Sequence, residues 1–222
     1  MKKNILILII ATIGFSSCKQ ASKSTPDTVD KETYNSVRNY EYADSMGNRL
    51  IIHNGTPKGG MKYTDPDGNV YGYVIFWTQI INKTINPLEL KIDFPLDSFE
   101  FPSLSGRYQR LLLPSDTMTI DKTSLSYYGL NVKSFLDNYR YKSSSLRRTI
   151  NPGDSTFFYV VILSKWKIIA GGSGSMRTGL SLKGQNLFYK ISAYKMTHEL
   201  PLTGKKEINC GSINFKNLVL QK

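Results

Sequence analysis

Apolar runs as long as β-strands, separated by turn-forming segments, recur along most of this chain. Leu88–Phe94 alternates apolar and polar residues at every position, which is typical of a strand with one buried face. Residues 157–163 are apolar on both faces, which indicates a central strand. Asp67 and Gly68 lie between residues 61–63 and the long run 70–81, and this arrangement predicts a hairpin. The pattern favours a protein built mainly from antiparallel strands.

The rest of the chain adds further strands and one helix. Apolar residues at the spacing of one helical face predict a short amphipathic helix over residues 131–140, within a loop. The apolar residues of this helix are Val132, Phe135, Leu136 and Tyr139. Further strands are predicted at residues 50–52, 110–113, 118–121, 180–183, 187–191 and 213–220. We therefore expect an all-β fold, an antiparallel β-sandwich with one short loop helix.

Residues 77–94 add a finer expectation about the sandwich. Here a long strand runs into an Asn, Thr and Pro corner and then into a second, alternating strand. This passage resembles an immunoglobulin-like sandwich, although the chain lacks the two cysteines that flank a tryptophan in antibody domains. An immunoglobulin-like topology without a disulfide is therefore expected.

The N-terminus carries the pattern of an export signal. Lys2 and Lys3 precede an apolar run, residues 5–15, which is too short to span a bilayer and has the length of a signal-peptide core. The run ends in Phe-Ser-Ser-Cys at residues 15–18. This ending resembles the lipobox of bacterial lipoproteins, in the form found among Bacteroidota.

The lipobox resemblance implies a lipid anchor. It implies that residues 1–17 are removed as a signal peptide, that Cys18 carries a diacylglyceryl group, and that the new amino terminus is acylated. Two or three acyl chains hold a protein stably on a membrane. The alternative is an ordinary secretory signal that leaves a free thiol at Cys18. Bacteroidota lipoproteins sent to the cell surface tend to carry acidic residues after the cysteine, whereas Lys19 and Lys23 lie here. We expect the periplasmic side of the outer membrane.

The chain between the signal and the first apolar run is polar. Residues 18–47 are rich in Ser, Thr, Asp, Lys and Asn and lack a sustained apolar period, so we predict a lipidated flexible tether there. Residues 48–222 are then predicted to form the β-sandwich domain. Cys210, whose only candidate partner is lipidated, is expected to be a free thiol that packs as a small hydrophobic residue.

The charge balance restricts the partners. The chain has 29 Lys and Arg against 17 Asp and Glu, a net charge of +12. Removal of Lys2 and Lys3 with the signal lowers the net charge to about +10. Nucleic acid is not a partner expected in the cell envelope, which leaves an anionic protein, an acidic glycan or lipid headgroups. The alternative is a solvated basic surface that serves solubility.

Residue types that carry catalysis or bind metals show no recognised arrangement. His53 and His198 lack a second histidine at ligand spacing, and neither HExxH nor CxxC occurs, so no metal site is predicted. Residues 171–175 approach a GxSxG motif but lack its last glycine. Asp65 and Asp67 have the spacing of calcium ligands, but a hairpin turn accounts for them better. We expect no cofactor and no enzymatic activity.

One loop has the composition of a binding surface. Residues 127–148 form the longest interval between predicted strands, and long loops on a rigid scaffold commonly carry function. Tyrosine and arginine together are typical of binding surfaces. The candidate binding residues are Tyr139, Arg140, Tyr141, Lys142, Arg147 and Arg148. We expect these cations to be exposed, so that their replacement leaves folding intact; the alternative is a basic cover over one end of the sandwich.

These observations give three functional hypotheses. The first is a membrane-anchored envelope lipoprotein with a non-catalytic binding domain for another envelope component. The second is a glycan-binding module, and the third is a hydrolase without a recognisable motif. Triplets of Asp, Ser or Thr, and an apolar residue also resemble the O-glycosylation sites of exported Bacteroidota proteins. The candidates are Thr28 and Ser45, with ordinary tether and turn residues as the alternative.

Overall fold

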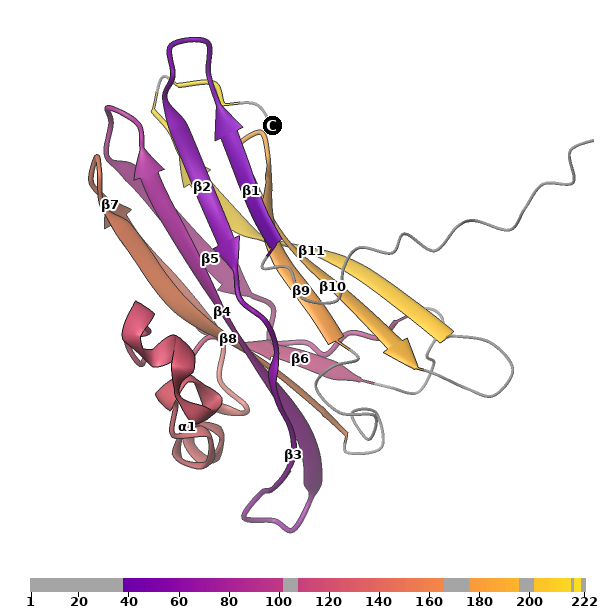
Figure 1. The fold of residues 1–222 in the computed structure, drawn as a ribbon. Coiled ribbons are helices and arrows are strands. Elements are labelled where there is room, and N and C mark those ends of the chain that lie inside the picture. Colours follow the sequence, from indigo (N-terminus) through magenta and orange to yellow (C-terminus); the bar gives the residue numbers. More distant parts are fainter. Residues whose placement is uncertain (1–37, 102–107, 166–175, 196–201, 217, 221–222) are drawn as a thin grey trace, which may run out of the picture. The chain divides into compact units, whose positions relative to one another are not determined.

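The computed structural model describes residues 38–101, 108–165, 176–195, 202–216 and 218–220, and its strands form two antiparallel sheets (Figure 1). Sheet A has the strand order β1-β2-β4-β8-β6, and β3 also pairs with β4. Its strands are β1 (Arg38–Ala43), β2 (Arg49–Asn54), β3 (Lys58–Thr64), β4 (Val70–Lys83), β6 (Gln109–Leu112) and β8 (Ser155–Lys165).

The long strand β4 organises sheet A. One edge of β4 pairs with β8 along almost its whole length, and the other edge pairs first with β3 and then with β2. The β3–β4 hairpin therefore extends beyond β1 and β2, as the lower part of Figure 1 shows. Its turn, residues 65–69, is the predicted Asp-Gly hairpin.

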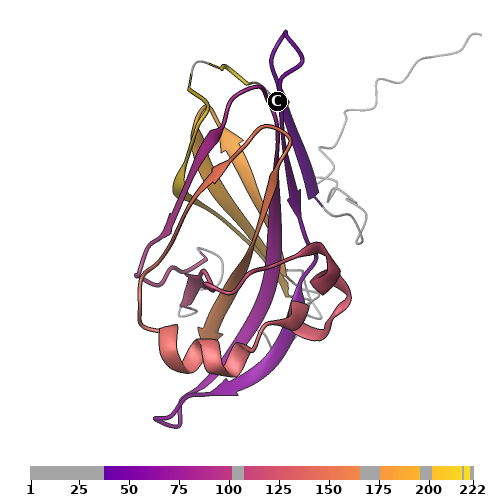
Figure 2. The ribbon, with the colours of Figure 1, turned by 90° about the vertical axis from the view of Figure 1, so that its left-hand side faces the viewer.

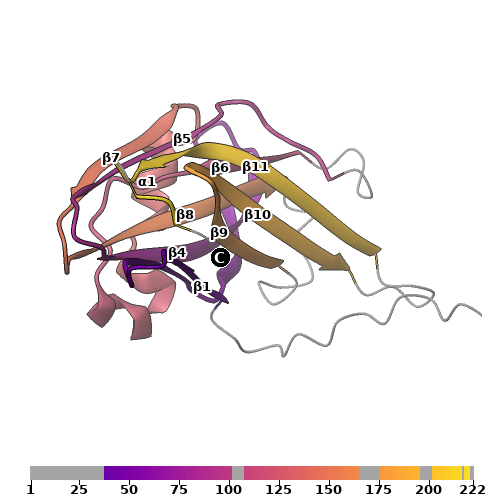
Figure 3. The same ribbon diagram turned by 90° about the horizontal axis from the view of Figure 1, so that it is seen from above.

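Sheet B has the strand order β7-β5-β11-β10-β9. Its strands are β5 (Leu88–Phe94), β7 (Ser144–Ile150), β9 (Met176–Lys183), β10 (Asn186–Lys195) and β11 (Leu202–Asn214). Figure 3 shows the two sheets as separate layers. The predicted all-β, sandwich-like architecture is confirmed. An immunoglobulin-like topology is not confirmed, because the last strand, β11, lies directly beside β5, whereas in that fold the last strand lies at the outer side of its sheet.

The sandwich core lies between the sheets. Alternate residues of β4 and β8 point into it, and the predicted inward residues of β5 do the same. Apolar burial of this kind supplies most of the free energy that stabilises a fold. The largest fully buried members are Leu50, Ile52, Phe76, Ile80, Leu88, Phe101, Phe158, Tyr189 and Phe215.

Hydrogen bonds from side chains of sheet A satisfy the backbone of β9 where β2 of sheet A and β9 of sheet B meet. Asn54 of β2 accepts the backbone N–H of Leu180 at 2.8 Å and donates to the carbonyl of the same residue at 3.1 Å. The hydroxyl oxygen of Tyr42 accepts the N–H of Leu182 at 2.7 Å. These bonds satisfy backbone groups of an edge strand that would otherwise be open to pairing.

A cap, residues 118–140, covers part of the outer face of sheet A (Figure 2). It consists of the 3-10 helices η1 (Ile120–Ser124) and η2 (Ser126–Gly129) and the helix α1 (Val132–Tyr139). Asn131 caps α1 by accepting the N–H of Ser134, and Val132, Phe135 and Leu136 are buried. The predicted loop helix is confirmed. Among the described residues no helix is long and apolar enough to cross a membrane.

Several predicted boundaries were wrong. β1 lies inside the predicted tether, because Tyr40 and Tyr42 alternate with polar residues and pack on the core. β7 lies inside the predicted loop, and Thr119 is followed by η1 rather than by a continued strand at 118–121. β11 begins at Leu202 and covers only the first two residues of the predicted strand 213–220. Both overlooked strands are rich in charged or polar residues, so they lack a strong apolar period.

Candidate functional site

A second hydrophobic cluster, the outer cluster, lies between the cap and sheet A. Its members from the sheet are mainly aromatic or large, and the cap covers them with apolar side chains. Sheet A contributes Tyr63, Tyr73, Ile75, Trp77, Leu112, Tyr159, Val161 and Leu163. The cap contributes Met118, Tyr128, Leu130, Val132, Phe135 and Leu136. Both faces of β4 and β8 are therefore buried, which explains why these strands are apolar at successive positions.

Lys58 of β3 fastens the first half of the cap to the sheet. Its ammonium donates hydrogen bonds of 2.7 Å to the carbonyl oxygens of Thr123 and Leu125. It also lies 4.2 Å from the centre of the Tyr128 ring, at cation–π distance. Burial lowers the pKa of Lys58. The Tyr128 hydroxyl in turn donates to the backbone carbonyl of Thr56.

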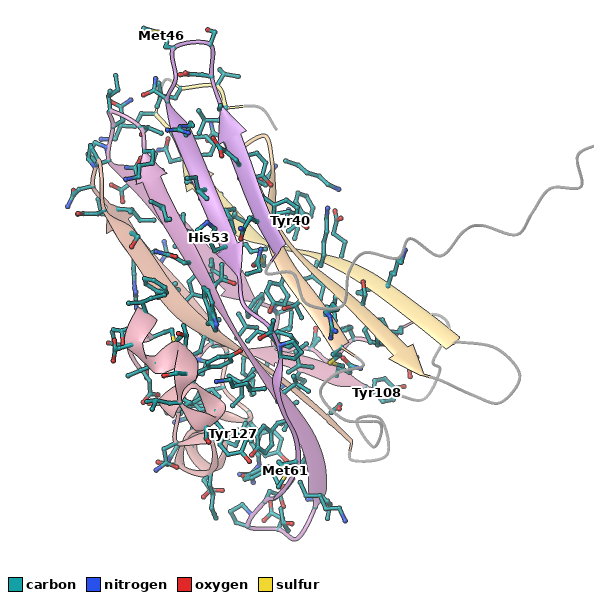
Figure 4. The ribbon with its side chains drawn as sticks, in the orientation of Figure 1. Tyr40, Met46, His53, Met61, Tyr108 and Tyr127 are labelled. Atoms are coloured by element: carbon teal, nitrogen blue, oxygen red, sulfur yellow. The ribbon has the colours of Figure 1, made fainter. Side chains whose placement is uncertain are left out.

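Tyr127 and Tyr128 adopt an unusual backbone conformation. Their φ angles are 50° and 56°, in the left-handed region that large side chains rarely occupy. The hydroxyl of Tyr159 holds this turn by donating to the carbonyl oxygen of Tyr128 at 2.7 Å. Figure 4 shows Tyr127 beside β3, where the cap meets the sheet, and its ring packs edge-on against Tyr73 at 6.0 Å. The strain is retained because packing and hydrogen bonds fix both tyrosines.

Arg140 fastens the second half of the cap to the β3–β4 hairpin. Its guanidinium lies 3.5 Å from a carboxylate oxygen of Asp65 and 3.1 Å from one of Asp67. Only 9% of the Arg140 side chain and none of the Asp65 side chain is exposed. Asp65 also accepts the backbone N–H groups of Asp67 and Asn69. Burial alone would raise the pKa of Asp65, but the hydrogen bonds from Asn69 and the charge of Arg140 hold it below its usual value.

Asp137 forms a third link between α1 and β3. Its carboxylate accepts a 2.8 Å hydrogen bond from the Tyr63 hydroxyl and a 2.7 Å bond from the ammonium of Lys133. The bond from Lys133, and then that from Tyr63, lowers the pKa of Asp137. Lys133 itself is 74% exposed, so the carboxylate orients it without removing it from solvent.

A small, half-open cleft lies between β3, β4 and the start of α1. The cleft has a volume of about 240 Å³ and is lined by Lys62, Tyr63, Thr64, Tyr73, Val132 and Lys133. Burial, and then a hydrogen bond with Tyr127, raises the pKa of Tyr73 to about 12, and burial raises that of Tyr63 as well. Both phenols therefore stay protonated at neutral pH. The lining combines ammonium groups, hydroxyl groups and ring faces, and it contains no carboxylate, histidine or cysteine.

The candidate binding residues at the end of α1 are only partly accessible. Tyr139 and Tyr141 have 42% and 59% of their surface exposed, and Lys142 lies 4.9 Å from the centre of the Tyr139 ring. The guanidinium of Arg140 lies 4.6 Å from the Tyr141 ring. Arg140 is buried, so the prediction that it is an exposed charge was wrong. The reason is that Asp65 and Asp67, far away in the sequence, lie opposite it.

Tyr141 also contacts the rest of sheet A. The Tyr71 hydroxyl donates a hydrogen bond to Tyr141, and this bond, followed by the nearby Arg140, lowers the pKa of Tyr141. Burial, and then the same bond, raises the pKa of Tyr71 to about 12. Arg110 of β6 lies at 6.0 Å from the Tyr141 ring and donates to the backbone carbonyl of Arg140. Two cations thus lie near this ring, and Tyr141 stays 59% exposed.

Arg147 and Arg148 lie on β7 rather than on a loop. Arg148 donates to the hydroxyl of Thr156 at 2.7 Å and to the carbonyl of Phe157 at 3.0 Å, so it links the edges of the two sheets. The prediction that it is a free surface charge was wrong, because β7 places it opposite β8. Arg147 is exposed on the outer face of sheet B. The structure therefore divides the six candidate residues between two faces of the molecule.

The remaining predicted residues fall outside this cleft. His53 lies on the upper part of sheet A, with its Nδ1 at 3.3 Å from Gln79 (Figure 4). Cys210 is buried, and burial raises its pKa to about 12. Ser45 is exposed in the β1–β2 turn. Cys18, Thr28, His198 and residues 171–175 lie outside the described residues. Among the described residues, no three His, Cys, Asp or Glu side chains gather as metal ligands.

The fold and the cleft define an all-β protein of two antiparallel sheets with a capped outer face. Comparison of the chain with models of known families, with curated proteins and with solved structures found no match.

Proposed function

We propose that the chain is an exported, lipid-anchored protein of the bacterial outer membrane, on its periplasmic side, whose β-sandwich-like domain binds another envelope component without catalysing a reaction. The export and anchoring part rests on the basic start, the apolar run and the lipobox that ends at Cys18. The binding part rests on the capped outer face of sheet A.

The cleft between the cap and β3 is the observation that carries the proposal. Asp137 joins two of its walls by bonding Tyr63 and Lys133, and Lys58 and Arg140 attach the rest of the cap to sheet A. A binding site needs such support, because side chains that must first be ordered weaken affinity. Its described lining offers hydrogen-bond donors and positive charge but no group suited to general acid–base or nucleophilic catalysis at neutral pH.

The size and charge of the cleft indicate its ligand. A volume of about 240 Å³ is smaller than most drug-sized ligand pockets, which suits one side chain or one sugar ring of a larger partner. Lys62 and Lys133 lie at the cleft and Asp137 pairs with Lys133, so these three residues carry one net positive charge, which an acid would match. The partner is therefore an anionic envelope protein or an acidic glycan.

The two partner classes can be separated with defined probes. The domain, residues 35–222, contains both hydrophobic clusters and can be used alone. We would titrate it with a glutamate-rich peptide and with oligogalacturonate, and follow the NMR signals of Thr64 and Tyr73. Saturable shifts with one probe, weakened about tenfold or more in K62Q/K133Q, support the proposal, since each lost charge removes about 1 kcal/mol or more of charge-assisted bonding. No saturable shift with either probe would overturn it.

Glycan binding is the second candidate, and the exposed tyrosines at the end of α1 favour it. Tyr139 and Tyr141 stand near each other in the chain and expose about half of their surface. Sugar stacking needs an open ring face, yet Lys142 and Arg140 lie over these rings. We therefore expect Tyr141→Ala to weaken the binding of oligogalacturonate less than K62Q/K133Q does.

The anchor is tested by replacing Cys18. Cys18→Ala should abolish lipid attachment and release the protein from the membrane fraction, and the measurement is cell fractionation with intact-mass analysis. Unchanged membrane retention and unchanged processing would contradict the anchor. Because the cleft is assayed on the domain alone, this result is independent of the binding part.

O-linked glycans at Thr28 and Ser45 are a further part of this proposal. Ser45 lies in an exposed turn and is an accessible acceptor. Protein purified from its own envelope should show hexose-type mass increments. A mass equal to polypeptide plus lipid would contradict the assignment.

A further inference from the structure

The outer face of β9, β10 and β11 is a basic surface. Strand alternation places Leu187, Tyr189 and Ile191 of β10 in the core, so Lys190 and its neighbours in alternation point away from it. Among the described side chains on this face, the charged ones are Arg177, Lys183, Lys190, Lys205 and Glu207. We name this surface the basic face.

Glu207 is the one carboxylate among the described side chains of the basic face. Glu207 lies 3.7 Å from the ammonium of Lys190 and also pairs with Lys183. These neighbours, Lys183 first, hold the pKa of Glu207 below its usual value, so it is ionised at neutral pH. Four cations against one carboxylate leave an excess of positive charge within three adjacent strands.

The strand register arranges the cations in rows. Ser192 of β10 lies opposite Arg177 on one side and opposite Lys205 on the other. Neighbouring strands lie about 4.8 Å apart, so two long cationic side chains flank a small hydroxyl-bearing residue at about 10 Å from each other. In the next row Lys190 lies opposite Glu207 and opposite Gly179, and the ring of Tyr40 lies against Gly179. Anionic groups can therefore approach the sheet at Ser192, between Arg177 and Lys205.

We propose that the basic face docks on the anionic headgroups of a phospholipid bilayer. A protein partner would call for large apolar anchors, which dominate binding energy at protein interfaces. The one large apolar side chain among the described residues of this face is Phe188, and the ammonium of Lys183 lies 4.7 Å from its ring centre. Several positive charges on adjacent strands instead match a layer of phosphate groups. This surface lies on the opposite sheet from the cleft, so the inference goes beyond the proposed function.

Vesicle binding of the domain, residues 35–222, tests the inference. We expect the domain to sediment with vesicles that contain phosphatidylglycerol and not with pure phosphatidylcholine vesicles, and binding should fall as salt rises. Each basic residue near an anionic surface strengthens binding about fivefold, so K190Q/K205Q should lower the partition coefficient on the order of tenfold or more.

The cleft variant K62Q/K133Q is the matched control, because it removes the same charge from the opposite sheet. We expect it to change vesicle binding less than about twofold, since its charges lie away from the docked surface. Circular dichroism of both variants checks that they remain folded. The inference is overturned if the domain does not bind phosphatidylglycerol vesicles, or if both variants lose binding equally. Either result leaves the cleft assay with acidic probes unaffected.

Discussion

The outer faces of the two sheets differ although both belong to one sandwich-like domain. On sheet A the outward residues of β4 and β8 are aromatic or aliphatic, and the cap buries them. On sheet B the outward residues of β9, β10 and β11 are mostly cations, serines and asparagines, with Phe188 and Glu207 among them, and most of them stay at the surface. A covered face can form a cleft, whereas an open face offers only a plane of side chains. The two faces therefore suit different partners.

Removing apolar contacts from the covered face should have the largest effect. Leu136 is fully buried between α1 and the sheet, so Leu136→Ala should lower the free energy of unfolding by about 2–5 kcal/mol. Phe188 on the open face is half-buried, and Phe188→Ala should cost less, about 1–2 kcal/mol. Urea denaturation measures both. Equal losses would contradict the view that the cap is an integral part of the fold.

The hydrogen bond that holds the left-handed turn should have an intermediate effect. Tyr159→Phe removes the donor to the Tyr128 carbonyl inside the outer cluster, which should cost about 1–3 kcal/mol because a buried carbonyl loses its partner. Tyr139→Phe alters an exposed ring and should change stability by less than about 0.5 kcal/mol. A loss in Tyr159→Phe no larger than that in Tyr139→Phe would show that this bond does not support the turn.

The link between Arg140 and Asp65 predicts a pH dependence of the covered face. The pKa of Asp65 is lowered in the folded protein, so its contribution is present above the unfolded pKa, about 4, and is lost as pH falls through the folded value. Stability against urea should therefore decrease in acid, and less steeply in Asp65→Asn. Parallel curves for the two proteins between about pH 5 and about pH 2 would contradict the role of this carboxylate.

Charge removal on the open face should have the smallest effect on stability. Lys190→Gln with Lys205→Gln changes exposed or half-exposed residues, so the free energy of unfolding should stay within about 0.5 kcal/mol of the parent. The measurement is again urea denaturation, at low and at moderate salt. A larger loss would mean that these lysines stabilise the sheet, and that the vesicle assay cannot be interpreted as docking alone.

The sequence predicts the parts of the fold whose pattern is local. Alternation in residues 88–94 and apolar spacing in α1 predict both elements, because each depends on neighbours within the same segment. β1, β7 and most of β11 were missed, since their burial depends on distant strands that cover one side of a polar segment.

The candidate site was harder to predict for the same reason. Arg140 resembles a surface charge in the chain, and only the fold brings Asp65 next to it. The cleft combines residues near position 63 with residues near position 132, and no local motif connects them. One signal was available: Tyr71, Tyr73, Ile75 and Trp77 share one face of β4. A strand that is apolar on both faces predicts a cover on each face.

The central claim, that the two outer faces meet different partners, can be tested in the native envelope with a photo-crosslinking amino acid in the full-length protein. One position is Thr64 at the cleft, another is Ser192 on the basic face, and Lys83 at the end of β4 serves as the reference. The account predicts a protein or glycan adduct from Thr64 and a lipid adduct from Ser192, both above the reference. The same adduct from both positions, or none above the reference, would contradict it.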